Sequence, residues 1–185
     1  MLRIMMIVCA MIGLSVSEAG ALSQSFDVTV AAFRQALDAR IKQDTRGGIA
    51  SCRARSKLEV DCTFRGNPNA GARGVLGRID HREHIALQTA DGKLVEIILN
   101  GQRNTQAAQK HFIGLVTSAV EALDPVLDHA KIGTIVDGLG LTRDDSAPDI
   151  GDARSYSAPG WTIQCLSQVS QVSTDLACTV QPGST

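Results

Sequence analysis

The sequence predicts an α+β protein in which an antiparallel sheet of hairpins, with about six to seven strands, is covered by two or three helices and carries two hairpin disulfides. Short segments with alternating apolar and polar residues, as in half-buried strands, occur in pairs separated by polar turns. Longer segments with apolar residues at helical spacing lie between them. The four cysteines that follow residue 21 fall two in the first hairpin and two in the last.

The first hairpin is predicted from the alternation around two cysteines. Residues 58–65 alternate without a break, so that Cys62 shares a face with apolar side chains. Placing Cys52 of the preceding strand opposite Cys62 keeps both cysteines on the buried face, whereas a slip by one residue would expose them. The same register sets up three further cross-strand pairs: Arg53 with Asp61, Ala54 with Val60, and Arg55 with Glu59.

The last hairpin follows the same logic. Trp161, Ile163 and Cys165 share one face of a strand, and pairing Cys165 with Cys178 sets Ile163 opposite Val180. A polar turn covers residues 167–175. Zinc-binding or redox-active cysteines are the alternative, but the chain has no C-x-x-C spacing. We therefore predict structural disulfides Cys52–Cys62 and Cys165–Cys178.

The other elements are expected from periodicity and turn signals. Asp91-Gly92 between two apolar segments is a strong hairpin turn signal. Asp124-Pro125 suits a helix start, since Asp caps helices and Pro fits the first helical position. The full set of expected elements is a helix over 27–42 capped by Asp27 or Ser25, a strand over 75–80, strands over 85–89 and 94–99, a helix capped by Asn104 or Thr105, a further helix from Asp124-Pro125 to Gly138, and a polar loop over 143–157.

Residues 1–21 have the features of a cleavable export signal. Arg3 gives a positive start, residues 4–14 are apolar or glycine, and Ala19-Gly20-Ala21 is a small-x-small cleavage pattern. The apolar stretch is shorter than the about 20 residues that a membrane-spanning helix needs. We therefore expect a mature protein of residues 22–185, secreted or periplasmic, forming a single domain with no membrane span after cleavage.

A short internal similarity relates the two cysteine hairpins. Residues 60–64 resemble residues 176–180, and each segment lies in a hairpin downstream of a helix. One interpretation is a duplicated helix-plus-hairpin unit with halves 22–101 and 102–185. The other is that strands of similar chemistry share short patterns by chance, which the absence of any further match favours.

Composition narrows the classes of partner. The net charge is −1, and Lys and Arg are not clustered, so nucleic acid is not an expected partner. Aromatic residues are few, and Trp161 with Tyr156 is the one aromatic pair that could contact a ligand. A core position for Trp161, on the same face as Ile163, is the competing interpretation and the stronger one.

The densest polar cluster contains His81, Glu83 and His84. These residue types can bind a metal ion or serve as an acid and a base, but at this spacing only a tight turn would bring the two imidazoles together. No nucleophile motif or phosphate-binding motif is present, and no catalytic residue, cofactor or metal site is predicted. The sequence favours a non-catalytic binding module (an inhibitor, adaptor or envelope assembly factor) with a protein or envelope ligand as its partner. The alternative is a small extracytoplasmic hydrolase or metal-binding protein that uses the His81/Glu83/His84 cluster.

Overall fold

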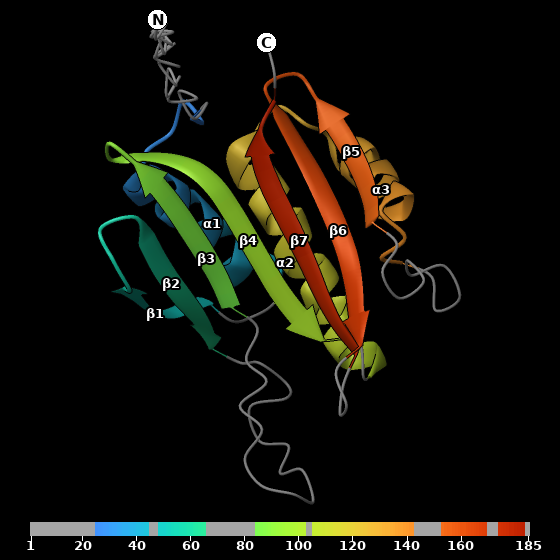
Figure 1. Cartoon of the computed structure of the whole chain (residues 1–185). Helices are drawn as coiled ribbons and strands as arrows, with labels where there is room; N and C mark the ends of the chain where they lie inside the picture. The colour runs from blue at the N-terminus through green and yellow to red at the C-terminus, as the bar shows by residue number, and fades with distance from the viewer. Residues whose placement is uncertain are drawn as a thin grey trace, which may run out of the picture.

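The structure, a computed structural model, describes residues 25–44, 48–65, 84–102, 105–142, 153–169 and 174–183. Over these residues the chain forms a seven-stranded antiparallel sheet and three helices (Figure 1), which confirms the predicted α+β class. The elements in chain order are α1 (Val30–Asp44), β1 (Gly48–Ala54), β2 (Glu59–Arg65), β3 (His84–Ala90), β4 (Lys93–Gln102), α2 (Gln106–Leu123), α3 (His129–Gly138), β5 (Ala153–Ala158), β6 (Trp161–Val169) and β7 (Thr174–Pro182).

The sheet is continuous, with strand order β1-β2-β3-β4-β7-β6-β5. Within β1–β4 and within β5–β7, each strand pairs with the next strand in sequence, as in hairpins. The pairing of β4 with β7 is the exception, since it joins a strand from the middle of the chain to the last strand and sets Leu99 opposite Cys178. The first and last hairpins thus become parts of one sheet.

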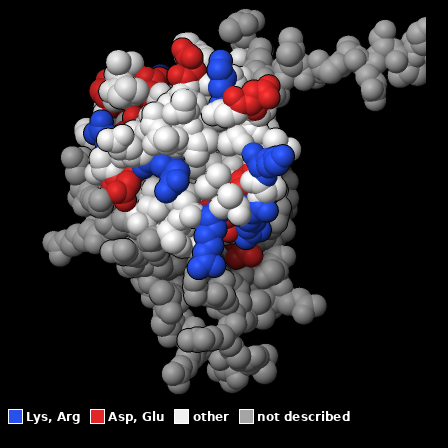
Figure 2. Space-filling view, turned by 90° about the vertical axis from the view of Figure 1, so that its left-hand side faces the viewer, with Lys and Arg blue, Asp and Glu red and all other residues white. Residues whose placement is uncertain are grey.

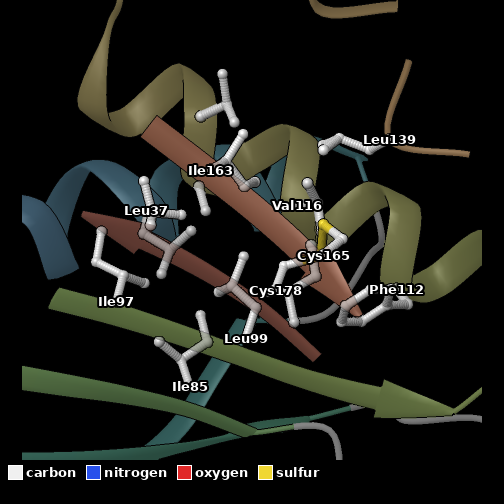
Figure 3. Packing of buried hydrophobic residues seen from close by; sticks show 14 of the residues in the cluster. Leu37, Ile85, Ile97, Leu99, Phe112, Val116, Leu139, Ile163, Cys165 and Cys178 are labelled. Atoms are coloured by element: carbon white, nitrogen blue, oxygen red, sulfur yellow. A yellow bond between two sulfur atoms is a disulfide. The ribbon is translucent and has the colours of Figure 1, made fainter. Parts of the chain in front are cut away.

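The helices α1 and α2 cover one face of this sheet (Figure 1). Alternation along the strands turns the apolar side chains toward these helices, because successive strand residues point to opposite faces. The resulting core is shown in Figure 3. Its fully or almost fully buried members include Phe33 and Leu37 of α1, Phe112 and Val116 of α2, and Ile85, Ile97, Leu99 and Ile163 of the sheet.

Gly101 of β4 lies directly beneath the ring of Phe112. A Cβ atom added at Gly101 would overlap the Phe112 side chain, so only glycine lets the aromatic ring approach the strand this closely. Phe112 itself is fully buried. The glycine in the strand and the phenylalanine in the helix therefore form one packing unit between the two layers.

The predicted central hairpin is confirmed. Asp91 and Gly92 have φ angles of 52° and 78°, the left-handed pair that a two-residue type I′ turn requires. The register of β3 against β4 shifts between Gln88 and Thr89, which marks a bulge beside the turn. Thr105 is confirmed as the cap of α2, because its Oγ1 accepts a hydrogen bond of 3.0 Å from the Ala108 amide.

Two predicted helix starts were wrong. The helix α3 begins at His129 with Asp128 as its cap, and Asp124 instead ends α2, its amide bonding to the Val120 carbonyl. Asp124 and Asp128 could each cap a helix, and in the structure Asp128 does so. Likewise α1 begins at Val30, capped by Thr29 rather than Asp27 or Ser25, because the backbone of residues 26–28 bonds to β4.

The prediction of a loop over residues 143–157 was wrong for its last residues. Residues Ala153–Ala158 form the edge strand β5, which pairs with β6 from Ala153 opposite Leu166 to Ala158 opposite Trp161. The alternation of exposed and buried residues in β5 is not evident from the sequence, because most of its residues are small or polar. Its partly buried residues are Arg154, Tyr156 and Ala158. The predicted strand over 75–80 lies outside the described residues.

Candidate functional site

Both predicted disulfides are confirmed. Cys52 pairs with Cys62 and Cys165 with Cys178, each as directly opposed residues of neighbouring antiparallel strands, with Cα atoms 4.1 and 4.0 Å apart. All four cysteines that follow residue 21 are therefore bonded to one another. Disulfides of this kind are typical of small extracytoplasmic proteins, because cytoplasmic reductants keep thiols reduced.

The charged pairs predicted around the first bridge are confirmed in part. Arg53 lies opposite Asp61 and Ala54 opposite Val60, as expected. Arg55 reaches Glu59 only at 4.0 Å, and makes its closer ion pair, 2.7 Å, with Asp61. Figure 2 shows the side of the molecule that carries β1 and β2, where acidic and basic side chains are intermixed.

The two bridges differ in exposure, and this predicts the order in which they are reduced. Cys165 and Cys178 are buried, whereas Cys52 is half-buried on the edge strand β1 and borders an opening of about 390 Å³ beside Arg34 and Asp38. A thiolate can attack a disulfide only where it reaches a sulfur atom. We expect limited reduction of the folded protein, followed by alkylation and peptide mapping, to label Cys52 and Cys62 first. Simultaneous labelling of all four cysteines would contradict this order.

A cleft of about 630 Å³ lies at the end of the sheet where β6 begins and β7 ends. We call it the Trp161 cleft. Four segments far apart in sequence form its walls: the segment before α1, the C-terminal end of α2, the β5–β6 turn, and the end of β7. The residues that line it are Ser25, Phe26, Asp27, Val28, Leu123, Asp124, Pro159, Gly160, Trp161, Pro182 and Gly183.

Backbone hydrogen bonds hold the walls of this cleft in place. The Phe26 amide bonds to the Leu94 carbonyl at 2.8 Å, which ties the segment before α1 to β4. Gly160 has a φ of +88°, which glycine adopts readily, and its carbonyl accepts from the Gly183 amide at 2.9 Å. A Cβ at Gly183 would come within 2.9 Å of the Trp161 amide nitrogen. The β5–β6 turn and the end of β7 are therefore packed backbone against backbone.

Trp161 belongs both to the core and to the cleft. Only 4% of its surface is exposed, as the core interpretation predicted, yet it also lines the cleft. Its Nε1–H donates to Asp124 Oδ2 at 3.5 Å. The centres of the Tyr156 and Trp161 rings are 5.9 Å apart. Lys131 of α3 places its Nζ atom 5.8 Å from the centre of the Tyr156 ring. The two predicted aromatic contact residues are thus neighbours in space, although only Trp161 lines the cleft.

Of the predicted His81/Glu83/His84 cluster, the structure describes only His84; His81 and Glu83 lie outside the described residues. His84 is the first residue of β3, and its Nε2 lies 3.0 Å from the Asn100 amide nitrogen on β4. Within the described ranges, no group of three or more His, Cys, Asp and Glu side chains could hold a metal ion. A metal or catalytic role for this cluster stays a prediction.

A buried carboxylate links the three helices, and it was not among the residues predicted from the sequence. Glu121 of α2 is only 6% exposed and lies 3.2 Å from His129 Nδ1 of α3 and 3.8 Å from Arg40 Nη1 of α1. The signal in the sequence was a glutamate among the apolar residues of α2. Its partners come from both neighbouring helices, so the contacts position α1 and α3 against α2.

The fold and its two bridges define a small disulfide-stabilised α+β protein. Comparison with known proteins adds no closer assignment: no protein-family model matches the chain, and no curated protein or solved structure shows significant similarity to it. Among the described helices, none is both long enough and apolar enough to cross a membrane.

Proposed function

We propose that this chain is an exported, non-catalytic binding protein and that the Trp161 cleft is its contact site. Roles as an inhibitor, an adaptor or an envelope assembly factor all fit such a module. The observation that carries the proposal is that the single tryptophan of the chain lines a cleft whose walls are fixed by backbone hydrogen bonds. Tryptophan is among the residues that contribute most to binding when they lie in a well-packed pocket.

The size and lining of the cleft support binding. Ligand sites are typically clefts of about 300–1,000 Å³ with mostly apolar walls and a few polar groups. The Trp161 cleft falls in this range, and its apolar walls carry two carboxylates, Asp27 and Asp124. Because the walls are anchored to β4 and to each other, little conformational entropy should be lost when a ligand binds.

Export is supported by two independent features. Residues 1–21 have the pattern of a cleavable signal, and the cysteines that remain after cleavage are all paired. A periplasmic or secreted location is therefore part of the proposal. Nucleic acid is not proposed as a partner, because the net charge is −1.

The two parts of this proposal are tested by two experiments, of which the first tests export. The full chain is expressed in a bacterial host, and the extracytoplasmic fraction is analysed by intact mass. We expect the mass of residues 22–185 less four hydrogen atoms, since each bridge removes two. A full-length cytosolic protein with four free thiols would contradict export.

The mature protein is then immobilised and used to capture a partner from native envelope or culture medium, in parallel with two variants. Ser25→Phe places a ring in the cleft, whereas Ser157→Phe places the same ring on the open face of the sheet, where Ser157 is exposed. We expect the wild type and Ser157→Phe to retain the same partner and Ser25→Phe to lose it. Equal retention by both variants would exclude the Trp161 cleft as the contact site.

A further inference from the structure

The charges that line the Trp161 cleft are all of one sign. Asp27 and Asp124 are the two charged residues among the described lining, and neither a lysine nor an arginine occurs there. Asp27 is exposed and Asp124 half-buried. Two carboxylates beside apolar walls raise the local negative potential, because the low-dielectric walls weaken screening by water. An anionic ligand would be repelled from such a cleft.

The aromatic lining favours the same sign of ligand. Phe26 and Trp161 both border the cleft, and the face of an aromatic ring attracts a cation. A cation–π contact of this kind is present beside the cleft. Lys131 Nζ lies 5.8 Å from the centre of the Tyr156 ring, and Tyr156 packs against Trp161. The Trp161 cleft thus offers carboxylates and aromatic rings within one space.

The remaining lining limits the kind of cation. Leu123, Pro159 and Pro182 supply apolar wall, which suits a hydrocarbon chain better than a bare hydrated ion. One carboxylate oxygen, Asp124 Oδ2, already accepts from the Trp161 indole. A divalent metal ion prefers several oxygen ligands around it, which this lining does not supply.

We propose that the Trp161 cleft binds an organic cation, namely an ammonium or guanidinium group carried on an apolar chain. This rests on the proposed function, because it assigns a ligand class to the same contact site. The carboxylates of Asp27 and Asp124 attract the charged group, and the apolar chain contacts the proline and leucine walls. The cation comes either from a free alkylamine or from a lysine or arginine side chain of a partner protein.

Three probes of equal chain length isolate the role of charge: hexylamine, hexanol and hexanoate. Trp161 is the single tryptophan of the chain, so its fluorescence reports occupancy of the cleft directly. We expect hexylamine, protonated at neutral pH, to bind about tenfold more tightly than hexanol, with hexanoate weakest, because each carboxylate contributes a severalfold preference. This preference should fall as salt is added, since salt screens partly exposed charges.

Charge-removing variants identify the responsible groups. Asp27→Asn should weaken hexylamine binding about threefold, and Asp27→Asn combined with Asp124→Asn should bring hexylamine and hexanol to equal affinity. Asparagine keeps a side-chain oxygen that can accept from the Trp161 indole, so the second change spares that hydrogen bond. Glu59→Gln is the matched control, because it removes one charge on β2, which β3, β4 and β7 separate from β6. Unfolding curves identify any variant that has lost its fold, and Asp27→Asn, at an exposed position, still tests the proposal alone.

The outcomes separate the ligand class from the contact site. Equal binding of hexylamine and hexanol, or tighter binding of hexanoate, overturns the organic-cation proposal and leaves the cleft as a contact site. If Glu59→Gln weakens hexylamine binding as much as Asp27→Asn does, the organic-cation proposal is also overturned, because the effect would then reflect net charge alone. No response of Trp161 to any probe, up to the solubility limit, overturns the proposal, while export and partner capture are judged by their own experiment.

Blocked pentapeptides distinguish the two sources of the cation. One carries a central lysine and the other a central glutamine, each between glycines. A lysine peptide that binds more tightly than hexylamine, with the glutamine peptide inactive, assigns the cation to a partner protein. Tighter binding of hexylamine than of the lysine peptide assigns it to a free amine.

Discussion

Replacing Phe112 with alanine is expected to lower the free energy of unfolding by about 3–5 kcal/mol, the range for removing a buried phenylalanine side chain. Phe112 is fully buried between α2 and the sheet, and its ring fills the space above Gly101 of β4. Gly101 has no side chain that could move into the space left by the ring. Urea unfolding of residues 22–185, followed by the Trp161 fluorescence, measures the change.

Two matched substitutions show whether the loss comes from the cavity. Phe112→Leu keeps much of the apolar volume, so it should lower the free energy of unfolding clearly less than Phe112→Ala. Val126→Ala removes apolar atoms from a side chain that is 89% exposed, and should change stability by no more than about 0.5 kcal/mol. A loss below about 1 kcal/mol for Phe112→Ala would mean that the Phe112 ring is not the packing unit between the layers.

Removal of the Cys165–Cys178 bridge, by changing both residues to alanine, is expected to cost about 3 kcal/mol or more. The bridge closes a segment with a sequence separation of 13, for which the chain-entropy estimate is about 3 kcal/mol. Both sulfur atoms are also part of the core, so their loss leaves a cavity between β6 and β7. The change is measured by urea unfolding under non-reducing conditions.

The Cys52–Cys62 bridge provides the comparison. Its sequence separation of 10 gives a similar entropy term, but Cys52 is only half-buried and β1 is an edge strand. Changing this pair to alanine should therefore cost less than changing Cys165 and Cys178. Equal or reversed losses would show that burial of the sulfur atoms adds nothing beyond the cross-link.

The strands that depend on local pattern could be predicted from the sequence. Alternation around Cys62 and around Cys178 fixes which side chains are buried, and a disulfide can form only if the two cysteines are on the same face. That constraint selected the observed registers of both cysteine hairpins. Asp91-Gly92 likewise encodes its turn in two residues, since both adopt positive φ. Local chemistry was sufficient in each case.

Features that depend on contacts between distant segments could not be predicted in this way. Asp124 looks like a helix cap in sequence, but in the structure it ends α2 and accepts from Trp161, a residue 37 positions away. The strand β5 has little apolar character of its own and is recognisable as a strand only through its pairing with β6. The Trp161 cleft combines four separate segments, so no single stretch of sequence indicates it.

The pairing of β4 with β7 has a consequence for the order of assembly. A chain that emerges from a ribosome or a translocation channel amino end first presents β4 long before residues 174–182, its partner, are available. Until then one edge of a largely apolar strand has no partner, and such an edge favours aggregation. Completion of the sheet must therefore wait until residues 174–182 are available, even though the pairing of β1 to β4 does not depend on them.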